Sequence, residues 1–415
     1  MERHRLRLPV AVAVTVAAAA LATFALRPRT GVIEPATVDP QAYFSPAELD
    51  RAREFRGPQR ALGLAGLGIS AGLLAVLAVR PPRRVRRALE AAGRRPLAGG
   101  AAAGATISVV LVAATLPLDA IGHVRAVEIG LSTQAWGAWL ADVAKSAGLG
   151  AVFAGAGAAG LLVLLRRFPR RAWIPGSVIA VGLSAAFVFL SPLVLEPLFN
   201  RFTPLPRGEL RTEVLELADR AGVDVGEVYR VDASRRTTSA NAYVGGLGST
   251  KRVVLYDTLI ERFPPDQVRS VVAHELGHVE GRDLLRGLLW LAIVAPPSLF
   301  LAQTLAERAR GRGRADEPRL PATPATLPAV ALSLALVSFA VGAAGNVLSR
   351  QVEARADGFA LRLTDEPRAF IDLERGLSLS NVSEPDPPAL WHLLLGTHPT
   401  TVERIGYGLA FARER

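Results

Sequence analysis

The chain has 415 residues, half of them hydrophobic, and a soluble globular protein of this length rarely carries so much apolar sequence, so the composition favours a membrane protein. The net charge of +11 comes from arginines in blocks beside apolar segments, which is typical of membrane topology and argues against a nucleic-acid partner. Cysteine is absent, which excludes disulfides and thiolate ligands, so any metal site must use His, Asp and Glu.

Seven apolar segments are long enough to cross a bilayer as helices, which takes about 20 residues each. They are residues 9–26, 61–79, 97–117, 147–165, 174–195, 285–304 and 325–347. The first follows a basic stretch, as a secretory signal would, but its length and the later apolar segments favour an uncleaved span. Small residues from Gly148 to Gly160 predict a helix face that packs closely against another helix.

The sequence between the fifth and sixth spans is polar and predicts a folded region outside the lipid. An amphipathic helix is expected at 207–221. Short strands are expected at 228–231, 242–244 and 252–256, and glycines between the last two predict a hairpin. After the sixth span we expect a basic, Pro-rich linker at 305–324, and after the seventh a mostly helical tail.

The segment from His274 to His278 reads His-Glu-Leu-Gly-His, on a helix predicted to span 264–281. One helical turn separates the two histidines, so both imidazoles lie on one face and can occupy two corners of a zinc tetrahedron. Glu275 lies one position further round, where it can accept a proton from a zinc-activated water. Buried structural histidines are the alternative, but two of only six histidines lie at ligand spacing around this glutamate.

A catalytic zinc needs a third protein ligand. The compact three-histidine form of the motif is excluded, because Leu284 occupies the position of its third histidine. Glu280 and Asp283 follow the motif too closely to fold back easily as ligands. Glu353 is the better candidate, and Asp357, one turn later, can hydrogen-bond a ligand imidazole and fix its tautomer. A surface carboxylate pair is the alternative for these two residues.

These motifs resemble the Ste24-type CAAX prenyl proteases, zinc metallopeptidases of family M48, over nearly the whole chain. The most specific stretch is Pro-Leu-Phe-Asn-Arg-Phe-Thr-Pro-Leu at 197–205. Ser-Ala-Asn-Ala-Tyr at 239–243 is similar to the family's Ser-Asn-Ala-Tyr segment, with Ala240 inserted or substituted. The histidine motif, the two later carboxylates and Thr-His-Pro at 397–399 follow in the family's order.

The resemblance implies a ring of seven transmembrane helices around a water-filled chamber, with the zinc site at its edge. It also implies cleavage near a substrate's C-terminus, in the best-known members beside a prenylated cysteine. By position, His398 would contact the tetrahedral oxyanion and Asn241 the substrate beside an edge strand. Arg404 would be a structural or substrate-binding arginine. A turn role for Asn241 and an exposed loop role for His398 are the alternatives.

The predicted fold is mainly α, a polytopic membrane protein with about seven transmembrane helices and a zincin-like catalytic region that carries a small β-sheet. We expect residues 1–203 to form a membrane domain of five helices. Residues 204–415 are expected to form an M48-type metallopeptidase domain that includes the spans at 285–304 and 325–347.

The predicted function is an integral membrane zinc metalloendopeptidase with one Zn²⁺ per chain. Its expected substrates are peptides or proteins with hydrophobic or lipidated C-termini. One alternative is a membrane quality-control protease with the same chemistry, and another is a zinc-binding transporter or channel, which leaves Glu275 without a role. We expect a monomer among membrane lipids, in a bacterial plasma membrane.

The basic loops also predict an orientation, because loops rich in Lys and Arg stay on the cytoplasmic side. The N-terminus and residues 80–96, 166–171 and 305–324 are basic, whereas 118–146 is poor in Lys and Arg. The zinc helix and the tail would then face away from the cytoplasm. The eukaryotic members of the family are known for a site that faces the cytosol.

Overall fold

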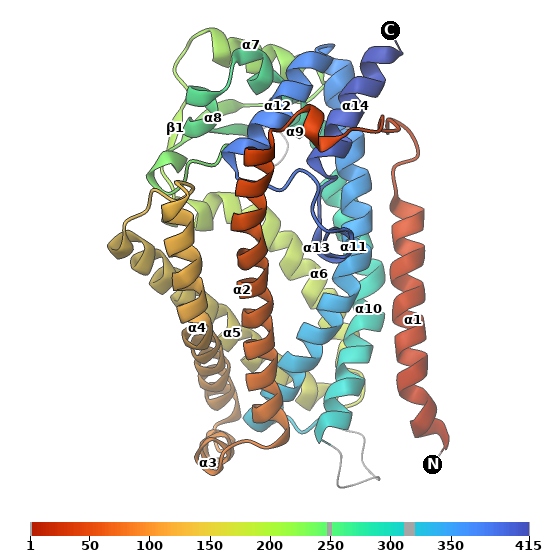
Figure 1. Ribbon diagram of the computed structural model, residues 1–415. Coiled ribbons are helices and arrows are strands. Elements are labelled where there is room, and N and C mark those ends of the chain that lie inside the picture. Colours follow the sequence, from red (N-terminus) through yellow and green to blue (C-terminus); the bar gives the residue numbers. More distant parts are fainter. Residues whose placement is uncertain (1, 247–250, 311–319, 415) are drawn as a thin grey trace.

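The computed structural model describes residues 2–246, 251–310 and 320–414. Within these ranges, seven helices are long and apolar enough to cross a membrane, and they form an elongated bundle (Figure 1). The predicted number of spans and the mainly α fold class are therefore confirmed. The helices are α1 (Glu2–Leu26), α2 (Pro46–Val79), α4 (Pro96–Glu128), α5 (Trp136–Arg167), α6 (Trp173–Leu190), α10 (Asp283–Arg310) and α11 (Leu327–Thr364).

Several of these helices extend well beyond the apolar segments that predicted them. The charged first half of α2, from Pro46, buries Leu49 in a cluster with Ile405 near the other end of the chain. Helix α11 continues without a break from its apolar half to Thr364, and so carries Glu353 directly. Hydrophobicity marks only the part of a helix that lies in hydrocarbon, whereas these helices continue into the catalytic region.

Helices α4 and α5 pack closely through small residues. A Cβ added at Gly104 of α4 would lie only 2.5 Å from the carbonyl oxygen of Ala154 and from the Cβ of Ala158. A Cβ added at Gly155 of α5 would lie 3.0 Å from the carbonyl oxygen of Ala101. The packing face predicted between Gly148 and Gly160 is therefore confirmed.

A four-stranded sheet lies at one end of the bundle, with strand order β1-β2-β4-β3 (Figure 1). The strands are β1 (Phe202–Pro204), β2 (Glu227–Val231), β3 (Ala242–Gly245) and β4 (Arg252–Tyr256). Strands β3 and β4 are antiparallel, as the predicted hairpin requires, and β2 pairs parallel with β4. Residues 247–250 of the hairpin loop lie outside the described residues. Strand β1 was not predicted, because three residues ending in proline carry no alternating pattern. Among the described strands, β3 is an edge.

The helix that carries the histidine motif is α9 (Pro265–Glu280), close to its predicted bounds. Val272 and Leu276 on its inner face are fully buried in the core of the catalytic region. They share that core with Leu255 of β4 and Leu361 of α11. The sheet and α11 therefore hold α9 from two sides, which fixes where the histidines point.

Shorter helices complete the end of the molecule that carries the sheet, and the predicted helical tail is confirmed. They are α7 (Glu209–Arg220), α8 (Asp257–Arg262), α12 (Pro367–Ser380), α13 (Ala389–Leu395) and α14 (Thr401–Arg413). Helix α3 (Arg83–Ala92) lies at the opposite end of the bundle (Figure 1).

The linker predicted at 305–324 is wrong in its first part, because α10 remains helical to Arg310. Ala306 is fully buried there and packs in a cluster with Leu327 of α11, so the helix has a partner beyond the apolar segment. Residues 311–319 of the predicted linker lie outside the described residues. The large chamber implied by the family resemblance stays a prediction.

Candidate metal centre and active site

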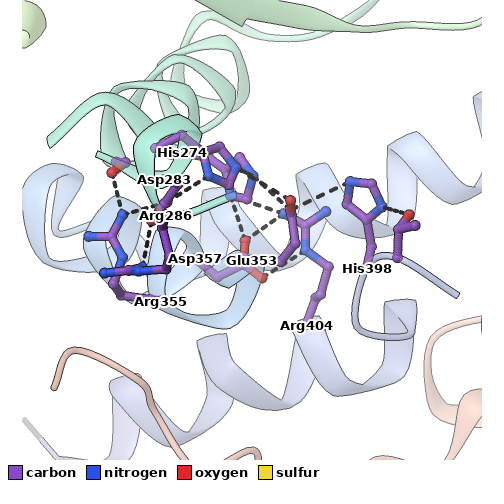
Figure 2. Close-up of polar contacts among 11 residues, drawn as sticks. His274, Asp283, Arg286, Glu353, Arg355, Asp357, His398 and Arg404 are labelled. Atoms are coloured by element: carbon purple, nitrogen blue, oxygen red, sulfur yellow. Dashed lines mark hydrogen bonds and ion pairs between the residues drawn. The ribbon is translucent and has the colours of Figure 1, made fainter. Parts of the chain in front are cut away.

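Three side chains from two helices converge at the end of the bundle that carries the sheet (Figure 2). His274 and His278 come from α9, and Glu353 comes from α11. The Nε2 atoms of the histidines are 3.1 Å apart, and they lie 3.3 and 3.5 Å from carboxylate oxygens of Glu353. One candidate ligand atom from each residue lies within 4.8 Å of the others. The fold thus brings together the three predicted ligands.

The hydrogen bonds around this cluster fit a bound cation. Each Nδ1 faces an aspartate oxygen, at 2.8 Å for His274 and 3.0 Å for His278. An ionised carboxylate only accepts hydrogen bonds, so each Nδ1 carries the proton and each Nε2 presents a lone pair. Oε2 of Glu353 is buried and accepts no hydrogen bond from the described residues. Three lone-pair atoms therefore face one another, and two imidazoles with one carboxylate are a donor set that suits zinc.

Asp357 orients the first histidine. It is completely buried, and its Oδ1 accepts the hydrogen bond from Nδ1 of His274. Arg404 donates from Nε to the other oxygen of Asp357 at 2.9 Å (Figure 2). Nη1 of Arg404 lies 2.8 Å from Glu374. Burial disfavours the charged form of Arg404, but these two carboxylates outweigh it and raise its pKa. The guanidinium therefore stays charged and holds Asp357 in place.

Asp283 orients the second histidine, a role that sequence reasoning missed when it considered this residue only as a ligand. Its Oδ2 accepts from Nδ1 of His278 and, at 2.9 Å, from Arg355 of α11 (Figure 2). Arg286 donates to its other oxygen at 2.6 Å. The chain can turn back because Arg282 adopts a left-handed conformation, with φ of 52°, between α9 and α10. An acidic residue just past the helix end was the available signal.

Gly281 is required by the position of Arg355. A Cβ at this residue would lie 1.9 Å from Nη2 of Arg355. The guanidinium crosses the end of α9 at that point, where it also donates to the carbonyl oxygen of Gly277 and to Glu280. The glycine after the motif therefore makes room for the arginine that holds Asp283.

Glu275 lies on α9 beside the ligand cluster and lines a cavity of about 300 Å³. Phe189 of α6 and Leu285 of α10 form apolar walls of the same cavity. Burial raises the pKa of Glu275 above its usual range, and the neighbouring His274 and His278 oppose this effect without cancelling it. A carboxylate with a raised pKa is a stronger proton acceptor than an ordinary surface glutamate.

A second cavity, of about 550 Å³, holds the remaining predicted site residues, Asn241, His398 and Arg404. His398 is 61% exposed at its side chain, and its Nε2 lies 3.5 Å from Oε2 of Glu353 (Figure 2). Asn241 is exposed and immediately precedes edge strand β3. Arg404 lines the cavity but is engaged with Asp357 and Glu374, as described above. Of these three residues, Asn241 and the Nε2 side of His398 are therefore the ones placed to contact a bound molecule.

Comparison with known families decides the class of protein. Residues 204–407 match the model of peptidase family M48, and residues 75–201 match the model described as CAAX prenyl protease N-terminal, five membrane helices. The chain belongs to peptidase family M48. It is a membrane metalloprotease of the Ste24 and CAAX protease type, which confirms the resemblance seen in the motifs and disfavours a transporter.

Relatives of this M48 metalloprotease extend across bacteria and eukaryotes. A Bacillus subtilis protein named "Uncharacterized metalloprotease YhfN" is 29% identical over 376 residues, 88% of this chain and 87% of that protein. The "CAAX prenyl protease 1 homolog" of Arabidopsis thaliana is 32% identical over 230 residues, and the match spans only 52% of its length. The crystal structure of S. mikatae Ste24p matches with a TM-score of 0.74 and 20% identity, over 97% of this chain and 98% of that one, so the two share a fold.

Proposed function

We propose that this M48 metalloprotease is a zinc endopeptidase that binds one Zn²⁺ per chain through His274, His278 and Glu353. The observation that carries the proposal is the convergence of three lone-pair atoms from these residues beside the carboxyl of Glu275. When bound, zinc supplies Lewis acidity, which favours deprotonation of water and polarises a peptide carbonyl.

The chain's own residues would then handle the protons and the developing charge. Glu275 accepts a proton from the attacking water and delivers it to the leaving amine, and its raised pKa suits both transfers. His398 lines the second cavity with its Nε2 3.5 Å from Glu353, and it donates a hydrogen bond from its imidazole to the carbonyl oxygen as that atom becomes negative. Asp357, Asp283 and Arg404 act through the histidines as positioning residues.

The substrate would bind as an extended strand beside β3. This strand has a free edge among the described strands, and a peptide can add to such an edge through backbone hydrogen bonds. Asn241, exposed at the start of the edge, would hydrogen-bond the substrate backbone. Both cavities lie along this strand, because Asn241 lines one and Val244 lines the other.

We further propose that the substrates have hydrophobic or lipidated C-termini and that the enzyme acts as a monomer in a bacterial plasma membrane. The cavity beside Glu275 has apolar walls from α6 and α10, which suit an apolar side chain or a lipid. The names of the plant and fungal relatives refer to CAAX sequences. A quality-control protease that clips damaged membrane proteins is the alternative, and substrates trapped by an inactive variant would separate the two.

Replacing Glu275 with Gln tests the proposal. The amide cannot accept the proton, so we expect cleavage of a hydrophobic peptide in detergent to fall by about a hundredfold or more, while zinc content stays at one per chain. Glu216→Gln, on an exposed position of α7, is the matched control and should keep full activity. Unchanged cleavage in Glu275→Gln, or loss of zinc from it, would overturn the assignment.

A further inference from the structure

Exposed arginines gather at the end of the bundle that lies opposite the metal centre. They come from α3 and its flanks, from the α5–α6 connection and from the last turn of α10. Figure 1 shows α3 lying across this end, below α2 and α4. We call this surface the basic end. Its exposed arginines are Arg80, Arg83, Arg84, Arg86, Arg87, Arg94, Arg95, Arg166, Arg167, Arg170, Arg171, Arg308 and Arg310.

Few carboxylates balance this charge. Among the described residues of these segments, the acids are Glu90 and Glu307. Glu90 makes a long, exposed contact of 3.7 Å with Arg86, and Glu307 is paired with Arg7 at 2.7 Å. The basic end therefore keeps a large positive charge at neutral pH.

The basic end is one packed surface rather than a set of separate loops. A single buried cluster joins Leu162 of α5, Ala306 of α10 and Leu327 of α11, and Leu89 of α3 packs against it. Gln303 of α10 also donates to the carbonyl oxygen of Arg170. Because Leu89 of α3 is partly buried against this cluster while the arginines of α3 are exposed, α3 has the form of an amphipathic helix at a membrane surface.

The length of helix α11 gives the distance between the basic end and the metal centre. The helix begins at Leu327 in the basic end and reaches Glu353 without a break. At a rise of about 1.5 Å per residue, these 26 steps span about 39 Å, more than the roughly 30 Å of a hydrocarbon core. The basic end and the metal centre therefore lie at opposite membrane surfaces.

The short connections on the side of the metal centre show no comparable charge. The α4–α5 connection, residues 129–135, has no charged residue. The α1–α2 connection, residues 27–45, has only two arginines, against seven in residues 80–95. Short loops rich in arginine are retained in the cytoplasm, and acidic residues contribute little to that choice, so the contrast between the two ends fixes an orientation.

We infer that the basic end lies at the cytoplasmic surface, against anionic lipid headgroups, and that the metal centre opens to the other side of the membrane. Arginines near such a surface are attracted by the negative charge of the anionic leaflet. The polypeptides that reach Glu275 are then exported chains or chains anchored in the outer face of the membrane. The orientation does not depend on the proposed zinc chemistry, and it narrows the class of substrates for that chemistry.

Cysteine labelling tests the orientation with little background, because the natural chain has no cysteine. Ala88→Cys in α3 and Asp224→Cys beside the sheet place single thiols at exposed positions of the two ends. In intact bacterial cells, we expect a membrane-impermeant maleimide to label Asp224→Cys at least tenfold more than Ala88→Cys. Both should be labelled fully after permeabilisation. The reverse pattern, or equal labelling of the two in intact cells, would overturn the inference.

Charge reversal tests the cause of the orientation. Changing Arg83, Arg84, Arg86 and Arg87 to Glu in the Asp224→Cys chain should lower its labelling in intact cells at least twofold. The same four positions changed to Lys form the control and should leave labelling unchanged. Equal labelling of the Glu and Lys variants would refute a role for charge. Peptide cleavage by the single-cysteine variants in detergent, where both membrane faces are accessible, reports separately on the proposed peptidase function.

Discussion

At the scale of single residues, each proposed ligand imidazole is held by its own carboxylate, and each carboxylate by arginine. His274 relies on Asp357, and His278 relies on Asp283. Such partners fix the tautomer and the ring orientation, so that Nε2 offers its lone pair without reorganisation when a metal binds. We call each set of histidine, carboxylate and arginine an arm of the site. The carboxylate of the first arm, Asp357, comes from α11, and that of the second arm, Asp283, comes from the first turn of α10.

Weakening the second arm should weaken metal binding. In Asp283→Asn the acceptor loses its charge, and we expect zinc affinity, measured by competition with a chromophoric chelator, to fall about ten- to a hundredfold. Glu280→Gln is the control, because Glu280 contacts the same Arg355 but no imidazole. An affinity in Asp283→Asn equal to that of the control would show that the aspartate does not position His278.

The raised pKa of Glu275 makes a prediction about pH. A general base must be deprotonated, so kcat/KM should fall as pH falls and the carboxylate takes up a proton. Burial raises this pKa in the metal-free site, whereas the charge of a bound zinc ion would favour the carboxylate, so the acid limb should be lost, not merely shifted, in Glu275→Gln. A profile measured with a peptide that has no titrating groups provides the check. The same acid limb in the residual activity of Glu275→Gln would contradict the role given to Glu275.

Residues of the site differ in how far sequence can predict them. The spacing of His274 and His278 is predictive because one turn of helix places them together whatever surrounds it. The contact of Asp283 with His278 depends on the left-handed conformation at Arg282. The contact of Arg355 with Asp283 depends on the approach of α11 to α9. The acidic residue just past the end of α9 is a local signal, but neither the backbone turn at Arg282 nor the approach of α11 can be read from residue spacing, so the contact of Asp283 with His278 was not predicted.

At the scale of elements, apolar length predicted how many helices cross the membrane but not where they end. The first half of α2 is charged along much of its length, yet it is helical because it packs on the C-terminal region. The site also depends on this kind of extension, because Glu353 lies on α11 beyond its apolar half. Where a helix is extended by packing on a distant part of the chain, its own hydrophobicity does not predict where it ends.

The close packing of α4 on α5 can be tested by replacing two glycines, one inside the contact and one outside it, with alanine. Gly104→Ala would push a methyl group into Ala154 and Ala158, and we expect a loss of about 1–3 kcal/mol in stability. Gly157→Ala is the control, because a Cβ there meets no atom within 4 Å and alanine favours helix by up to about 1 kcal/mol. The midpoint temperature of thermal unfolding in detergent should be lower for Gly104→Ala than for the wild type, and for Gly157→Ala it should equal or exceed the wild-type value. The opposite order would contradict the close approach.

At the scale of the whole molecule, the membrane helices and the metal centre assemble together. Helix α9 leads through a tight turn into α10, and α11 returns along α10 to place Glu353 beside the histidines. Hydropathy predicted the two spans, but only the fold shows that their pairing sets the distance between α9 and Glu353. Correct insertion of α10 and α11 is therefore a condition for metal binding, and loss of either span should abolish the site.

X-ray absorption at the zinc edge of the purified enzyme tests the central claim most directly. We expect one zinc per chain, with two imidazole nitrogens and carboxylate oxygen at about 2.0–2.2 Å, and a loss of the carboxylate contribution in Glu353→Ala. Three imidazoles would instead make His398 a ligand. That result, or a spectrum unchanged in Glu353→Ala, would contradict a site built from His274, His278 and Glu353.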